Sequence, residues 1–334
     1  MSDVAILDDA LDLLGDRAPE YGGGLSNHGP MAAEALVHLG RAELVPAWAE
    51  AYVGRLDPFV ASDDERPPAL GDLSSYAAWL VRARAELAAS APWRPVVTTW
   101  CGLLVDGAVA AAGHGLLRTA HAVRALTMAD TAPRRAELAR GLAYWAATYQ
   151  RLPGVPRPTG DRRAAAALAA LPAPAGGGAF FISDAVRALD DVPGFPAAVD
   201  SLDPSELVLT RLVDAIVPRA LAGAERHAIV YVHTLTVPAA VRTLASVLPP
   251  GAAATALAYT WQAMAALAAA FPVDVVSGPA AGTRRGTSAD ELLDAAVANG
   301  DEHAIKVTAA ALGEVAAGAD PAILSAALAL VRRM

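Results

Sequence analysis

The spacing of apolar and polar residues predicts an all-α protein. Alanine, leucine and valine recur every three or four positions from end to end, whereas alternating runs of β-branched residues are almost absent. This period is typical of helices that bury one face. We expect helices over residues 31–39, 44–53, 73–89, 101–112, 115–128, 133–151, 204–222, 227–248, 252–270, 289–298, 302–316 and 321–332.

Stretches rich in glycine or proline separate these helices without dividing the chain into independent domains. They fall at residues 21–24, 153–158, 172–178 and 277–286. The second and third stretches bracket a short segment, which indicates a surface excursion over residues 153–178. We therefore predict one multi-helix domain that spans residues 1–334.

A weak internal repeat suggests that this domain contains a duplication. His114 and His233 are each followed by the motif Ala-Val-Arg and then by the motif Leu-Ala-Tyr. These motifs begin at Ala122 and Leu142 in the first half and at Ala240 and Leu257 in the second half. A duplicated helical unit would place the two histidines in equivalent positions.

Composition and charge exclude several classes of protein. With 54% hydrophobic residues, the chain can bury a large core and is not disordered. Its 26 basic and 35 acidic residues give a net charge of -9, and no run of Lys or Arg offers a nucleic-acid surface. Residues 1–15 are acidic, unlike a targeting presequence. Cys101 is the only cysteine, which favours a cytoplasmic protein with a structural thiol.

One uncharged stretch, residues 251–273, is about long enough to span a bilayer. It contains Tyr259, Thr260 and Gln262, and its apolar positions are mostly alanine, which gains little from lipid. These features favour a helix buried in a protein core, so we expect no membrane span.

Two glycine-rich motifs resemble nucleotide-binding loops only in composition. Gly113-His114-Gly115-Leu116-Leu117-Arg118 follows no predicted strand and has Arg118 in place of the third glycine. Residues 278–288 lack the Gly-Lys-Ser/Thr core of a phosphate-binding loop. We therefore expect no nucleotide, flavin or NAD(P) site.

The histidines have a spacing that limits how they can bind a metal. The seven are His28, His38, His114, His121, His227, His233 and His303. His114 and His121 share a helix face but lie about 10 Å apart along its axis. His227 and His233 point to different faces of a helix. One ion can therefore receive about one histidine from each of four segments. We assign His38 and His227 to the surface or the core.

Lys306 is the only lysine among the 26 basic residues. Asp301 can cap a helix, which places His303 and Lys306, three residues apart, on one face of its first turns. An ammonium beside a metal-binding histidine would repel the cation. Two explanations stay open: burial keeps the amine neutral and CO2 converts it to a metal-binding carbamate, or the lysine has no special role.

Four motifs, in this order along the chain, resemble the successive signatures of the questin oxidase-like family. They are Ser26-Asn27-His28-Gly29-Pro30-Met31 with Ala35-Leu36, His114-Gly115-Leu116-Leu117-Arg118, His233-Thr234-Leu235-Thr236 with Ala240, and Asp301-Glu302-His303-Ala304-Ile305-Lys306. The resemblance implies helices packed around a central buried metal site. It also implies a flavin-independent, iron-dependent dioxygenase or monooxygenase of Baeyer-Villiger-like outcome. Such an enzyme cleaves a ring of an anthraquinone or related aromatic polyketide with O2.

The resemblance further implies that Fe(II) is held by His28, His114, His233, His303 and a carboxylated Lys306. This set agrees with one histidine from each segment. Many relatives have a second histidine where this chain has Arg118, so the surroundings of the metal differ there.

Arg118 and His121 are the candidate catalytic residues. Arg118 could polarise a substrate carbonyl or form a surface ion pair. His121 could donate a hydrogen bond near the metal or be an ordinary helix histidine.

Two other functions fit the same residues. A carboxylated lysine also serves metal-dependent hydrolases, in which a metal-bound water is the nucleophile, and a non-catalytic helical protein can carry scattered histidines.

Six aromatic residues could line an apolar pocket for a flat substrate, although each is also typical of a helical core. They are Trp100, Trp145, Trp261, Tyr144, Tyr259 and Phe271. The sequence does not indicate an oligomeric state.

Overall fold

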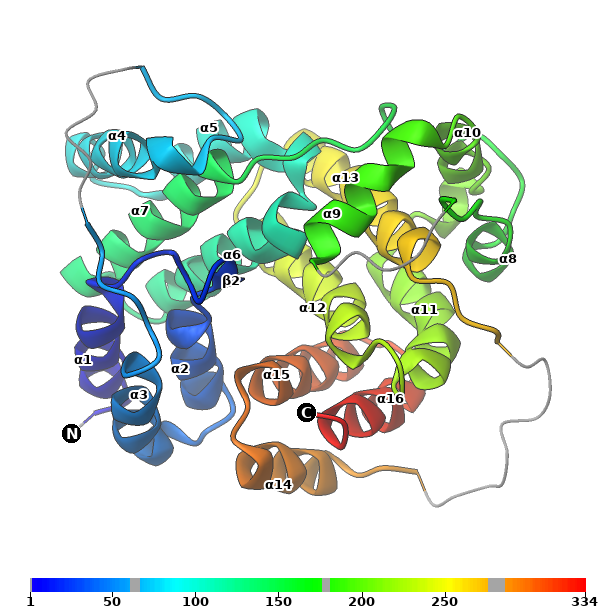
Figure 1. Cartoon of the computed structure of the whole chain (residues 1–334). Helices are drawn as coiled ribbons and strands as arrows, with labels where there is room; N and C mark the ends of the chain where they lie inside the picture. Colours follow the sequence, from blue (N-terminus) through cyan, green and yellow to red (C-terminus); the bar gives the residue numbers. More distant parts are fainter. Residues whose placement is uncertain (1, 61–66, 176–180, 276–285) are drawn as a thin grey trace. The chain divides into compact units, whose positions relative to one another are not determined.

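A computed structural model describes residues 2–60, 67–175, 181–275 and 286–334. Within these ranges the chain forms sixteen α-helices, joined by short 3-10 turns, and one two-stranded antiparallel ribbon (Figure 1). The all-α prediction is therefore confirmed. The ribbon pairs β1 (Glu20–Tyr21) with β2 (Leu25–Ser26) across the glycine stretch 22–24.

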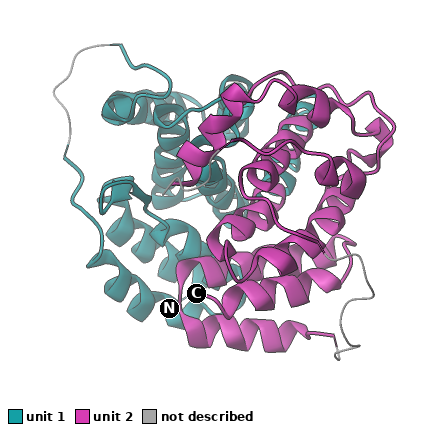
Figure 2. Ribbon diagram, turned by 45° about the vertical axis from the view of Figure 1, so that its right-hand side comes forward, with its two compact units in different colours: residues 1–151, 240–256 teal, residues 152–239, 257–334 magenta. Residues whose placement is uncertain are grey.

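The chain divides into two compact units that exchange segments (Figure 2). Unit 1 contains Met1–Arg151 and Ala240–Ala256, and unit 2 contains Leu152–Ala239 and Leu257–Met334. Two helices, α12 (Ala228–Ala245) and α13 (Pro250–Ala270), supply residues to both units. Because neither unit is one continuous segment, this division does not decide whether residues 1–334 fold as a single domain, which stays a prediction.

Unit 1 contains seven complete helices. They are α1 (Asp3–Gly15), α2 (Gly29–His38), α3 (Val45–Val53), α4 (Tyr76–Ala89), α5 (Arg94–Leu104), α6 (His114–Met128) and α7 (Ala132–Ala147). Helix α7 packs against both α4 and α6. The α6–α7 contact requires glycine, because a Cβ atom on Gly115 would lie 2.5 Å from the Cα of Trp145. This glycine of the His114 motif thus serves helix packing.

Two predictions for unit 1 were wrong or incomplete. Helix α1 was not expected, yet Ser2 caps it and Leu7, Leu11 and Leu14 bury one face. The helix predicted over 101–112 instead runs from Arg94 to Leu104, with a proline in its first turn. It cannot continue, because 3-10 turns and a left-handed segment occupy residues 105–113.

Unit 2 contains seven further complete helices. They are α8 (Ala164–Ala169), α9 (Ile182–Arg187), α10 (Phe195–Asp200), α11 (Leu209–Gly223), α14 (Ala289–Asn299), α15 (Glu302–Ala316) and α16 (Ala322–Val331). Helix α16 packs against α11, α14 and α15. Its buried leucines and alanines form the core on which α15 rests. Helix α11 begins at residue 209 and not at residue 204 as predicted, because a 3-10 turn precedes it.

Two glycine-rich regions of the sequence fall partly outside the described residues. In the segment 153–178, the described residues up to 175 include α8, and Gln262 Nε2 donates a hydrogen bond to the carbonyl of Pro153 at 3.0 Å. The glycine-rich loop 278–288, examined for phosphate binding, lies outside the described residues except for 286–288.

The predicted internal repeat falls on two pairs of consecutive helices. The first copy lies on α6 and α7, and the second lies on α12 and α13. His114 is the first residue of its helix, whereas His233 lies in the second turn of α12, so the two histidines are not at the same helical position. The duplication stays a prediction.

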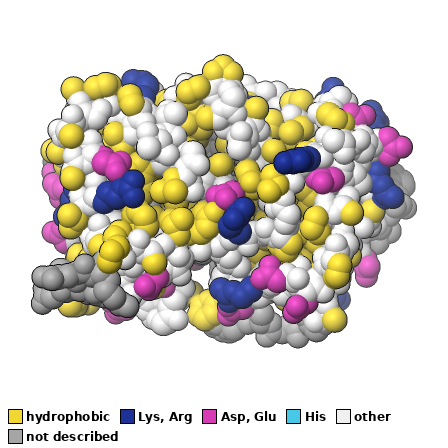
Figure 3. Space-filling model, turned by 90° about the horizontal axis from the view of Figure 1, so that it is seen from above, with side chains coloured by type: hydrophobic (Ala, Val, Ile, Leu, Met, Phe, Trp, Pro, Cys, Tyr) yellow, Lys and Arg dark blue, Asp and Glu magenta, His cyan; other side chains and the backbone are white. Residues whose placement is uncertain are grey.

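One helix in the described residues, α12, is long and apolar enough to cross a membrane by length and composition. Of its most apolar window, 67% is buried inside the structure, and a protein core helix passes the same test. The uncharged stretch 251–273, which is about long enough to span a bilayer, coincides largely with α13. Its side chains Trp261, Met264 and Leu267 are buried. On the face drawn in Figure 3, basic and acidic side chains are interspersed among apolar ones.

Candidate metal centre

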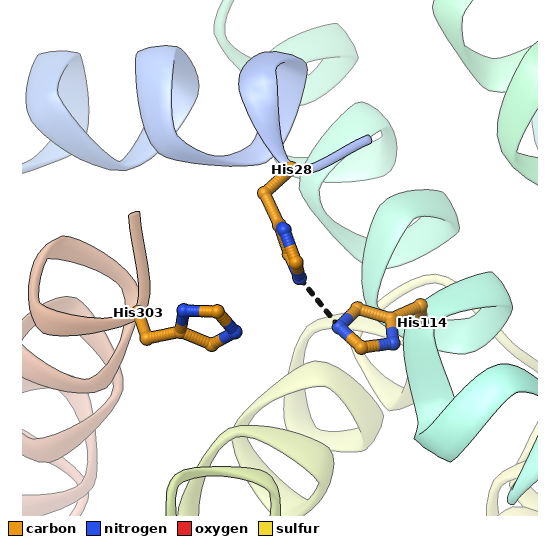
Figure 4. Close-up of side chains that lie close together, drawn as sticks. All are labelled: His28, His114 and His303. Atoms are coloured by element: carbon orange, nitrogen blue, oxygen red, sulfur yellow. Dashed lines mark hydrogen bonds between the residues drawn. The ribbon is translucent and has the colours of Figure 1, made fainter. Parts of the chain in front are cut away.

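Unit 1 brings two of the predicted ligands into direct contact. The Nε2 atoms of His28 and His114 lie 2.7 Å apart, and both residues are buried (Figure 4). The two rings are nearly perpendicular, with an interplanar angle of 69°. Metal–imidazole bonds of about 2.0–2.1 Å place two neighbouring octahedral nitrogens about 2.9 Å apart. The pair therefore has nearly the nitrogen spacing that one divalent ion requires.

His28 is held at the start of α2 by its backbone. It directly precedes the helix, which has Pro30 in its first turn. Its N–H donates to the hydroxyl of Tyr52 at 3.1 Å, and the next N–H, of Gly29, donates to Asn27 Oδ1 at 3.0 Å. These bonds engage backbone groups at the helix start, and the imidazole itself does not cap the helix.

His114 is held by the left-handed segment that precedes α6. Its Nδ1 lies in a short hydrogen bond with the carbonyl oxygen of Ala111. Because a carbonyl oxygen only accepts, Nδ1 carries the proton, and in the neutral form of the ring the lone pair is on Nε2. His114 therefore presents Nε2 in the form that a metal ion binds.

Unit 2 holds the other predicted ligands. The rings of His233, on α12, and His303, on α15, have centroids 6.1 Å apart. His233 Nδ1 donates to the carbonyl of Ile229 at 2.7 Å, which again leaves the lone pair on Nε2. Burial, with the neighbouring Lys306 and His303, lowers the pKa of His233 to about 3. His233 is therefore neutral at physiological pH, as metal binding requires.

His303 is oriented by the residue that caps its own helix. Asp301 Oδ1 accepts from the backbone N–H of His303 at 2.7 Å and from its Nδ1 at 3.0 Å. Burial lowers the pKa of His303, and the bond to Asp301 opposes this shift. Ligand atoms of Asp301, Glu302 and His303 lie within 4.8 Å of one another. The carboxylate–histidine pair matches the support that metal-binding histidines usually have.

Lys306 lies on the buried face of α15, one turn from His303. It is 2% exposed. Burial lowers its pKa to about 7, although Glu302 and Asp301 act in the opposite direction. Within the part of the chain that the structure describes, no salt bridge or hydrogen bond involves its Nζ. A large fraction of this amine is therefore neutral near pH 7.

Arg118 does not form the surface ion pair considered from the sequence. The residue is 1% exposed, and its Nε and Nη2 donate to the two carboxylate oxygens of Glu137 at 2.6 and 3.0 Å. This buried pair joins α6 to α7. Its geometry favours a structural role over polarisation of a substrate carbonyl.

His121 contacts a carboxylate on another helix. Its Nδ1 lies 2.6 Å from Glu34 Oε2 on α2, and Arg124 binds the same carboxylate through Nε and Nη2. Burial would raise the pKa of Glu34, but Arg124 and His121 hold it well below its ordinary range. Glu34 stays ionised and joins α2 to α6, and His121 takes part in this junction.

The other candidate residues belong to the core or surface. His38 is exposed at the end of α2, and His227 stacks edge-on against Phe271. The three candidate tryptophans are fully buried, and each indole N–H is bonded, to Glu86 and to the carbonyls of Gly107 and Val199. These tryptophans form core packing, and the sequence offered no signal for their hydrogen-bond partners.

Comparisons with known proteins give no further assignment. No model of a protein family matches the chain, and no curated protein matches it. The resemblance to the questin oxidase-like family therefore rests on the four ordered motifs and on the chemistry of the side chains that they contribute.

Proposed function

We propose that this protein is an iron-dependent oxygenase that opens a ring of an anthraquinone-like aromatic polyketide with O2. Its Fe(II) ligands are His28, His114, His233, His303 and a carboxylated Lys306. One observation carries the proposal. His114, His233 and His303 each have Nδ1 bonded to an oxygen atom, so that Nε2 is the available ligand atom.

The chemistry of these donors fits a divalent ion. Metal binding needs neutral imidazoles, and burial keeps His233 and His303 neutral. A neutral Lys306 amine can attack CO2, forming one N–C bond and releasing one proton, which converts it to a carbamate anion. Four neutral imidazole nitrogens and one carbamate oxygen would then surround the divalent ion, and the negative carbamate would partly compensate its charge.

Bound iron would supply the activation of O2, which no amino-acid side chain provides. The protein's own residues keep His233 and His303 neutral and fix the proton positions of His114, His233 and His303. The pairs Arg118–Glu137 and His121–Glu34 stabilise the helices that carry two of these ligands. We assign Arg118 and His121 this supporting role.

The proposal is tested by metal content and oxygen consumption. After anaerobic Fe(II) loading and removal of excess metal, we expect about one iron per chain. We also expect the variants His28→Ala and His303→Ala, one from each unit, to lose that iron, whereas the exposed His38→Ala retains it. If each variant lost a different ion, the five-ligand assignment would be wrong.

Turnover distinguishes the three functions considered from the sequence. We expect the iron-loaded protein to consume O2 only with an anthraquinone-type substrate and to yield a ring-opened product. Product formation without O2 consumption would indicate the metal-dependent hydrolase. Less than about half an equivalent of any transition metal after loading would indicate a non-catalytic helical protein.

A further inference from the structure

The segment before α6 has a backbone conformation that requires an explanation. Ala111 and Ala112 have φ angles of 46° and 59°, and Gly113 follows with φ 91°. The two alanines are the only non-glycine residues with positive φ in the ranges that the structure describes. L-residues with a side chain rarely adopt this conformation, because their Cβ crowds the backbone. Such strain persists only where the surrounding structure imposes it, often at functional sites.

This left-handed segment directs one carbonyl group at His114. The oxygen of Ala111 accepts from the backbone N–H of His114 and also from its Nδ1. A return of Ala111 to right-handed angles would rotate the peptide plane that follows it and turn this oxygen away. The strained backbone and the proton position on His114 are thus parts of one arrangement.

We propose that the left-handed turn Ala111–Gly113 is a positioning element, which fixes the proton of His114 on Nδ1 and thereby presents Nε2 to the metal. The inference rests on the proposed function for its metal-binding consequence. Its effect on the proton position concerns the metal-free protein and can be measured without any metal. Ala111 is half-buried, so its side chain can be changed with less disturbance than that of the buried Ala112.

Substitutions of Ala111 separate the turn from the bulk of the side chain. Glycine and asparagine tolerate positive φ, whereas the β-branched valine does not. Nitrogen-15 NMR of the histidine rings in the metal-free protein reports which nitrogen carries the proton. We expect the Nδ1–H form of His114 in the wild type, Ala111→Gly and Ala111→Asn, and its loss in Ala111→Val.

Anaerobic Fe(II) affinity, measured by competition with a chelating dye, gives the second readout. We expect Ala111→Gly and Ala111→Asn to stay within about threefold of the wild type and Ala111→Val to bind about 10- to 100-fold more weakly, as for other partners of ligand histidines. Circular dichroism checks that Ala111→Val is folded. If it does not fold, the ring spectrum of the wild type still decides.

Two results would overturn the inference. One is a wild-type His114 protonated on Nε2, and the other is a folded Ala111→Val variant with the wild-type proton position. If no variant and no wild-type protein binds Fe(II), the proposed function fails, whereas the proton position of His114 still tests the turn itself.

Discussion

Asp301 Oδ1 lies 3.0 Å from the Nδ1 of His303 and 2.7 Å from its backbone N–H. One carboxylate therefore begins helix α15 and orients the imidazole that follows it. Aspartate is a preferred N-cap residue, and metal-binding histidines usually donate their second ring N–H to a carboxylate or a carbonyl. Asp301 does both for His303, so replacing Asp301 tests both roles.

Asp301→Ala should weaken both the helix and metal binding. We expect a loss of about 1 kcal/mol in the free energy of unfolding from the missing cap. We also expect Fe(II) affinity to fall about 10- to 100-fold from the missing imidazole partner. Denaturant unfolding of the metal-free protein measures the first effect, and chelator competition measures the second.

Asp301→Asn is the matched control, because asparagine also caps helices but has no charge. It should keep the unfolding free energy within about 0.5 kcal/mol and still bind Fe(II) more weakly than the wild type. Wild-type Fe(II) affinity in both variants would show that the carboxylate does not support His303.

Lys306 should carry a carbamate in the presence of bicarbonate. Carbon-13 NMR with labelled bicarbonate should show a carbamate signal that Lys306→Arg lacks. Because the pKa of Lys306 is lowered to about 7, the neutral amine increases from pH 6 to pH 8, and the signal should increase with it. Lys306→Glu, which supplies a carboxylate, should bind Fe(II) more tightly than Lys306→Arg. An identical spectrum of Lys306→Arg and the wild type would contradict this assignment.

The Arg118–Glu137 pair should contribute strongly to stability through the cost of breaking it. Glu137→Gln leaves a buried guanidinium without its counter-charge, and we expect a loss of about 3–5 kcal/mol in the unfolding free energy. The double variant Arg118→Met with Glu137→Leu should recover part of this loss, because neither of these two charges is then buried, whereas the buried Arg140 still lacks its 3.9 Å contact with Glu137. Denaturant unfolding measures both variants.

The exposed pair Arg82–Glu86 on α4 is the control for this prediction. Its side chains are 46% and 33% exposed, so Arg82→Met should cost less than about 1 kcal/mol. Equal losses from Arg82→Met and Glu137→Gln would show that burial does not set the strength of the ion pair.

Cys101 should be unreactive in the folded protein. Burial raises the pKa of its thiol to about 12, so iodoacetamide labelling should stay slow between pH 7 and pH 9 and become fast only on unfolding. The folded state keeps a proton that the unfolded chain releases above about pH 9, so the unfolding free energy should fall as the pH rises from about 9 to 12. Cys101→Ala removes the part of this dependence that the thiol contributes. Fast labelling of the native protein at pH 8 would show that the thiol is accessible.

Much of the secondary structure could be predicted from the sequence, because helix formation depends on local spacing. The repeats of alanine, leucine and valine identify α2, α6, α14 and α15 to within a few residues. The prediction of a helix over residues 101–112 was wrong, because α5 ends at Leu104 and a left-handed segment interrupts an apolar run whose composition is typical of a helix. Ala111 and Ala112 are good helix formers, so nothing local announces their positive φ angles.

The sequence by itself determined the class of fold and the small set of histidines and the one lysine that we propose as metal ligands, because periodicity and side-chain chemistry are properties of the chain alone. Only the folded backbone decided which oxygen atoms the imidazoles of His114, His233 and His303 meet: the carbonyls of Ala111 and Ile229 and the carboxylate of Asp301, each within four residues of its histidine. It also decided that Arg118 is buried against Glu137. Proton positions and pKa values depend on burial and on neighbours, and many of these are distant in sequence, as Glu34 and Glu137 are.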